Sequence, residues 1–74
     1  MVIKPSEFEI IVIDIEFLFN DELEATIYSV GHSVPSIFKK GSRVAFCGDE
    51  DMVTSINGIE IAILCESEVL LISD

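Results

Sequence analysis

The sequence predicts an all-β fold of five or six short strands, arranged as a barrel or a sandwich. Ile, Val and other aliphatic residues gather in short runs, and turn-forming residues interrupt these runs about every ten residues. No stretch sustains helical spacing over two turns, apart from an ambiguous one at residues 22–30. A chain of 74 residues has room for one domain, so we expect residues 1–74 to form a single unit.

The first strand is expected at residues 7–19. Both of its faces are apolar from Phe8 to Ile13, whereas Asp14 and Glu16 make one face polar beyond that point. A strand that is apolar on both faces has to be covered on both sides. In a protein this small, a neighbouring subunit is one way to supply that cover.

The later strands follow from the turns that separate them. Asn57-Gly58 lies between two apolar runs and is the strongest hairpin signal, because a type I′ turn needs positive φ at both central residues. After this turn, residues 59, 61, 63 and 65 occupy one face of a strand and residues 60, 62 and 64 the other. The strands expected after the first one are residues 24–30, 43–47, 52–56, 59–65 and 68–73.

Charge and composition exclude several functions. The chain has 14 acidic and 4 basic residues, a formal net charge of −10, and half of its residues are hydrophobic. The apolar content argues against disorder, and the acidity argues against binding to nucleic acid. The apolar runs are far too short to span a membrane, and Glu7 and Glu9 interrupt any signal-peptide pattern. We therefore expect an intracellular protein without nucleic-acid or membrane partners.

A domain of this size usually needs a disulfide, a metal or a partner subunit for stability. Cys47 and Cys65 allow one disulfide at most, and together with His32 they do not fill a four-ligand zinc site. In a reducing compartment we expect both cysteines to be buried free thiols. Oligomerisation is the remaining source of stability, and the high apolar fraction favours it.

Catalytic and metal-binding motifs are absent from the sequence. Asp49-Glu50-Asp51 lacks the alternating spacing of cation ligands, so a solvated loop is expected there. His32 lies between turn-forming residues with no nucleophile motif, which favours a turn histidine over a catalytic one. We expect no enzymatic activity and no cofactor.

Three of the four basic residues, Lys39, Lys40 and Arg43, flank the turn at Gly41. Two interpretations stay open for them. They either meet the acidic surface of a neighbouring subunit, or they form a solvated turn that offsets a little of the negative charge.

Four blocks of the sequence resemble the GroES-type co-chaperonin family in their order along the chain. They cover nearly the whole length, and the stretch from Tyr28 to Pro35 also resembles bacteriophage-encoded members. The blocks are Ile3-Lys4-Pro5 with Ile10-Ile11-Val12, Ala25-Thr26-Ile27-Tyr28-Ser29-Val30-Gly31, Lys40-Gly41-Ser42-Arg43-Val44-Ala45-Phe46, and Leu64-Cys65-Glu66-Ser67-Glu68-Val69-Leu70.

The resemblance implies a small GroES-like β-barrel that forms a homo-oligomeric ring, closed by the first strand of one subunit and the last strand of the next. It therefore implies subunit contacts through two groups of residues. These are Ile10, Ile11, Val12 and Ile13, and Val69, Leu70, Leu71 and Ile72.

The chain departs from the family pattern in two places. Between Val12 and Ala25 only about Ile15 to Glu24 is left for a loop, too few residues for the family's long mobile loop, and the roof hairpin between Gly31 and Gly41 is shortened. Phe17-Leu18-Phe19 is a hydrophobic tripeptide near the place where the family carries its chaperonin-docking motif. The alternative is that these three residues complete the first strand or fill the end of the barrel.

The expected function is that of a non-enzymatic, ring-forming co-chaperonin-like protein in the cytoplasm, with a chaperonin as partner. The alternative is a bacteriophage virion structural protein, such as a neck, capsid decoration or cement protein, that keeps the barrel and no longer binds chaperonin. The shortened loop favours this alternative, whereas the coverage of the whole chain by the family blocks favours the first.

Overall fold

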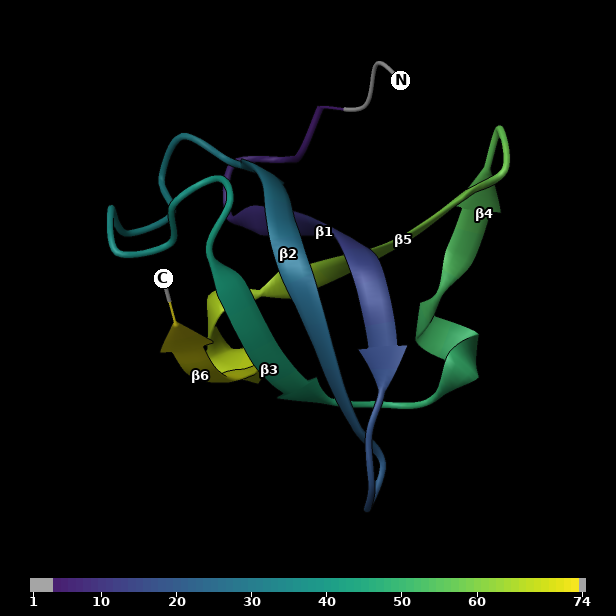
Figure 1. Cartoon of the computed structure of the whole chain (residues 1–74). Coiled ribbons are helices and arrows are strands. Elements are labelled where there is room, and N and C mark those ends of the chain that lie inside the picture. The colour runs from purple at the N-terminus through teal and green to yellow at the C-terminus, as the bar shows by residue number, and fades with distance from the viewer. Residues whose placement is uncertain (1–3, 74) are drawn as a thin grey trace.

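The computed structural model describes residues 4–73 and shows a small all-β domain (Figure 1). Its six strands form one antiparallel sheet in the order β4-β5-β1-β2-β3-β6. Two single-turn 3₁₀ helices, η1 (Glu50–Met52) and η2 (Glu66–Glu68), precede β4 and β6. No helix in this part of the chain is long and apolar enough to cross a membrane. The strands are β1 (Glu9–Phe17), β2 (Glu22–Val30), β3 (Arg43–Cys47), β4 (Thr54–Ile56), β5 (Ile59–Cys65) and β6 (Val69–Ser73).

The predicted all-β fold is confirmed, and two strands, β3 and β5, have the bounds that the sequence predicts. The ambiguous stretch at residues 22–30 is a strand throughout. Asn57 and Gly58 both have positive φ, as the hairpin prediction requires. The first strand is shorter than expected because turns and bends lie at its predicted ends, and the fourth is shorter because η1 includes Met52.

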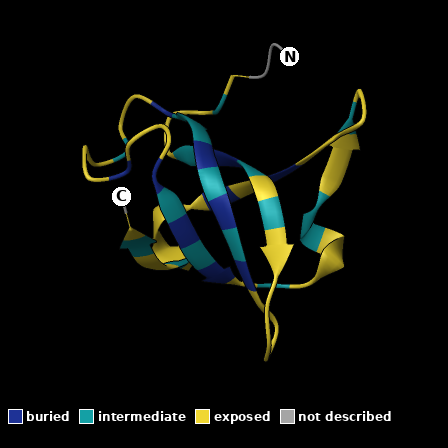
Figure 2. Ribbon diagram, in the orientation of Figure 1, coloured by how far each residue is buried: buried dark blue, intermediate teal, exposed yellow. Residues whose placement is uncertain are grey.

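The hydrophobic core lies on the face of the sheet that β1, β2, β3 and β5 share. Along β2 and β3 buried residues alternate with more exposed ones, as Figure 2 shows. In β1 and β5, consecutive residues are buried. Phe38, from the loop before β3, adds a buried ring to the same cluster. The other buried members are Ile10, Val12, Leu23, Ala25, Ile27, Val44, Phe46, Ala62 and Leu64.

A β-bulge at Asp14 divides β1 into two parts. Between Ile13 and Glu16 the strand advances three residues while its partner β2 advances two, and Asp14 has φ 53°. The extra residue reverses the inward and outward positions, so Ile10, Val12 and then Ile15 all pack on the core. Strict alternation, which puts Ile15 on the face of Ile13, is therefore wrong for this strand.

The opposite face of β1 and β5 is also apolar, as the sequence predicts. Ile11 pairs with Ile63 across the two strands, and both lie outside the core cluster. Ile11 and Ile61 are nevertheless buried within the single chain. A second subunit is therefore not needed to cover these two residues.

Candidate functional site

The tip of the β1–β2 hairpin presents three neighbouring apolar side chains to solvent. The chain turns at Asn20 and Asp21, which both have φ 58°, and the Glu22 amide donates to the Phe19 carbonyl oxygen at 3.2 Å. Positive φ at both central residues is the signature of a type I′ turn. The turn holds the predicted tripeptide at the end of the hairpin, away from the core cluster.

Phe17, Leu18 and Phe19 are all exposed, and Phe19 keeps 88% of its surface accessible. These residues therefore do not fill the end of a barrel, and β1 ends at Phe17. Burying an exposed Phe or Leu side chain in a partner yields about 1.5–3 kcal/mol, so the tip offers a favourable contact surface.

The hairpin tip is fixed to the neighbouring end of β3. Glu22 pairs with Cys47, and the Gly48 amide donates to the Asp21 carbonyl oxygen at 2.8 Å. An open hollow of about 340 Å³ lies between the tip and the following acidic segment, lined by Phe17, Leu18, Asp21, Glu22, Gly48, Asp49 and Glu50. The site thus combines apolar side chains with a rim of carboxylates on a short, hydrogen-bonded scaffold.

The predicted subunit contacts fall into two different environments. The side chains of Ile10, Ile11 and Val12 are completely buried in the single chain, and β1 is paired with β2 on one edge and β5 on the other at these residues. They have neither free surface nor a free edge for a second subunit, so this part of the prediction has to be corrected. Ile13, which is only partly buried, is the remaining candidate on β1.

The last strand keeps its exposed surface. Leu70 and Leu71 are exposed, Val69 and Ile72 are partly buried, and within residues 4–73 β6 is paired only with β3. Val69, Leu70, Leu71 and Ile72 therefore remain candidates for a subunit contact.

Arg43 is engaged within the chain. Its guanidinium donates to Glu24 Oε1 at 3.0 Å, to Thr26 Oγ1 at 2.8 Å and to the Asp14 carbonyl oxygen at 3.1 Å. It also lies 3.4 Å from Glu16 Oε1. Arg43 thus pairs with acidic residues of its own sheet. It neither meets a neighbouring subunit nor forms part of a solvated turn, the two interpretations that the sequence leaves open.

Lys39 and Lys40 stay exposed, and the Lys40 ammonium lies 5.4 Å from the centre of the Tyr28 ring. These two lysines are the only members of the basic cluster that remain available to a partner.

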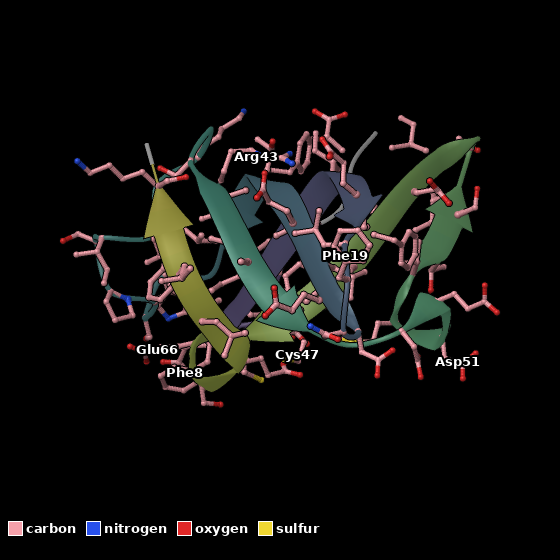
Figure 3. The ribbon with its side chains drawn as sticks, turned by 60° about the horizontal axis from the view of Figure 1, so that its bottom comes forward. Phe8, Phe19, Arg43, Cys47, Asp51 and Glu66 are labelled. Atoms are coloured by element: carbon pink, nitrogen blue, oxygen red, sulfur yellow. The ribbon has the colours of Figure 1, made fainter. Side chains whose placement is uncertain are left out.

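The two cysteines are free thiols, but both are exposed, so the prediction that they are buried is wrong. Each is the last residue of its strand, Cys47 in β3 and Cys65 in β5, where the sheet no longer covers the side chain. Figure 3 shows Cys47 at the lower margin of the sheet.

The acidic run and the histidine are both exposed, as the sequence favours, but Glu50 and Asp51 belong to η1 and not to a loop. Asp49 caps η1 by accepting a hydrogen bond from the Asp51 amide at 3.0 Å, and residues 49–51 are exposed. Within residues 4–73, no group of three potential ligands could hold a metal ion. His32 is exposed in a turn, with its Nε2 3.4 Å from Glu7 Oε1, which also accepts a hydrogen bond from the Ser33 hydroxyl at 2.8 Å.

Two features of the surface are not predicted from the sequence. One is the carboxylate rim of the hairpin tip, because the register of β2 and β3 is what brings Asp49 and Glu50 to Phe17. The other is the exposed Ile63 beside a hollow of about 270 Å³ under β4.

Comparison of the chain with protein-family models and with curated proteins finds no match.

Proposed function

We propose that this chain is a non-enzymatic, ring-forming co-chaperonin-like protein of the cytoplasm, which assists protein folding or assembly by protein–protein contact. The observation that carries the proposal is the solvent-exposed apolar tip at residues 17–19, held on a hydrogen-bonded hairpin. In this proposal the tip docks in an apolar groove of a chaperonin. A short, ordered hairpin loses little conformational entropy on docking, which favours binding.

The subunits of the ring meet through the last strand, where Leu70 and Leu71 are exposed beside an unpaired edge. Pairing such an edge with another subunit also removes an aggregation hazard. The proposed activity needs no bound metal or cofactor.

Native mass spectrometry of the protein alone, and mixed with chaperonin and ATP, tests the proposal. We expect a closed oligomer that binds the chaperonin, and we expect Leu18→Asp to abolish this binding without changing the circular dichroism spectrum. Ile63→Asp is the matched control, because Ile63 is an aliphatic residue of similar exposure outside the tip and lies on β5, which is not an edge strand. Loss of β-structure in Leu18→Asp would instead assign Leu18 to the folded core.

One observation favours a second candidate, a bacteriophage virion structural protein built on the same domain. The hairpin turn between β1 and β2 is tight, so the tip reaches a short distance from the sheet. A neck, decoration or cement protein needs stable surfaces and no long loop. An oligomer or monomer that ignores the chaperonin in the same experiment would favour this role.

A further inference from the structure

We propose that copies of this chain associate head to tail, with the free edge of β6 in one copy pairing antiparallel to the free edge of β4 in the next. In this arrangement Lys39 and Lys40 of one copy face the acidic residues 49–51 of the other. The inference rests on the self-association in the proposed function and names the two surfaces that meet.

The two strands are the ends of the sheet, so each has one edge without a partner in the described part of the chain. They lie at opposite sides of the molecule in Figure 1. The side chains of Thr54 and Ser55 in β4 and of Leu70 and Leu71 in β6 are exposed and uncharged. Two free edges on different sides allow a head-to-tail contact, in which each copy uses a different surface from its neighbour.

The ends of these two strands carry unequal charges. β6 begins after the acidic η2, which contains Glu66 and Glu68, and it ends where Ile72 shares a hollow with Lys39. β4 begins after the acidic η1 and ends at the uncharged turn Asn57-Gly58. Figure 3 shows Glu66 and Asp51 near opposite sides of the molecule.

These charges select one strand direction. In the antiparallel direction the lysine end of β6 meets the acidic start of β4, while Glu66 and Glu68 meet the uncharged turn. In the parallel direction Glu66 and Glu68 would meet Glu50 and Asp51, and four carboxylates would repel one another. Charge therefore disfavours the parallel pairing and stabilises the antiparallel one.

Charge also identifies the occupant as a second copy. A chain with a net charge of −10 repels its own copies unless its few cations are placed at the contact. Arg43 is used within the chain, whereas the exposed Lys39 shares a hollow with Ile72 of β6, and Lys40 follows it in the chain. The densest acidic run lies directly before β4. Both halves of a complementary interface are thus present on the same chain.

A charge-swap experiment with two double variants tests this contact. Lys39→Glu/Lys40→Glu makes both edges acidic, and Glu50→Lys/Asp51→Lys makes both edges basic. We expect each variant alone to be monomeric by native mass spectrometry at a concentration where the wild-type chain is assembled. Their equimolar mixture should regain assembly, with the two variants in a 1:1 ratio.

The control is Glu7→Lys/Glu16→Lys, which has the same net charge as Glu50→Lys/Asp51→Lys but carries its changes at exposed residues outside the hairpin tip and both edge strands. This control should assemble like the wild-type chain. Wild-type-like assembly of both double variants, or no recovery on mixing, would overturn the inference. It would leave the proposed function intact if the wild-type chain still binds chaperonin. A monomeric wild-type chain would also overturn the inference. Native mass spectrometry of the wild-type chain mixed with chaperonin and ATP tests docking separately.

Discussion

The two hairpins of this domain turn in the same way but present different surfaces. Each has two consecutive residues with positive φ at its tip, Asn20-Asp21 in the β1–β2 hairpin and Asn57-Gly58 in the β4–β5 hairpin. The first hairpin carries the exposed tripeptide and is hydrogen-bonded to Gly48 beside β3. The second is formed by β5 and the three-residue β4, whose other edge has no partner strand among the described residues.

This difference shows that turn geometry alone does not determine what a hairpin does. The β1–β2 hairpin has Leu23 buried near its tip, so the sheet supports the apolar residues that it exposes. The β4–β5 hairpin has exposed Ile59 directly after its turn and offers backbone groups along β4. The first hairpin is therefore suited to side-chain docking and the second to strand pairing.

The largest expected effect comes from removing the support of the first hairpin. Leu23→Ala should lower the free energy of unfolding by about 2–5 kcal/mol, because it leaves a cavity in the core. Ile59→Ala in the second hairpin should cost less than about 1 kcal/mol, since that side chain is partly in solvent. Urea unfolding followed by circular dichroism measures both. Equal losses would show that the two hairpins are supported to the same extent.

An intermediate effect is expected from the turns. Gly58→Ala should lower the free energy of unfolding by about 1–2 kcal/mol, because an alanine at φ 81° is strained although no atom obstructs its Cβ. Asp21→Gly should raise it by up to about 1 kcal/mol, because it gives the first hairpin the Asn-Gly pair of the second. Thermal unfolding of both variants checks the opposite signs, and a stabilised Gly58→Ala would contradict this account of the turn.

The smallest effect on stability is expected at the most exposed residue. Phe19→Ser should change the free energy of unfolding by no more than about 0.5 kcal/mol, as is usual for a surface substitution. It should nevertheless weaken chaperonin binding at least tenfold, because a tenfold change corresponds to only about 1.4 kcal/mol of lost contact. Isothermal titration calorimetry beside a thermal scan separates the two quantities. Unchanged binding would remove Phe19 from the docking site.

The sequence predicts the strands well because most of them follow period-two patterns between clear turn signals. The bounds of β3 and β5 and the turn at Asn57-Gly58 are examples. It does not predict the bulge at Asp14, because an inserted residue leaves no mark in a run of alternating isoleucines. The positive φ of Asp14 is a property of the pairing between β1 and β2, which a single strand does not reveal.

The candidate site is predicted only in part, for a similar reason. The tripeptide is visible in the sequence, but its exposure depends on where the hairpin turns. The exposure of Cys47 and Cys65 and the completed pairing of β1 depend on strand ends and neighbours, which emerge only when the sheet is assembled.

The bulge at Asp14 has a consequence for how this chain can change in evolution. Residues before it and after it reach the same core only because one extra residue separates them. Inserting one more residue beside Asp14 would turn Ile15 outward and Glu16 inward, because it would shift the alternation of every residue after it by one position. We therefore expect insertions into β1 between Ile13 and Glu16 to be inherited less often than substitutions of its residues. Substituting an isoleucine of β1 by valine alters the size of one contact, whereas an added residue exchanges the two faces of half a strand.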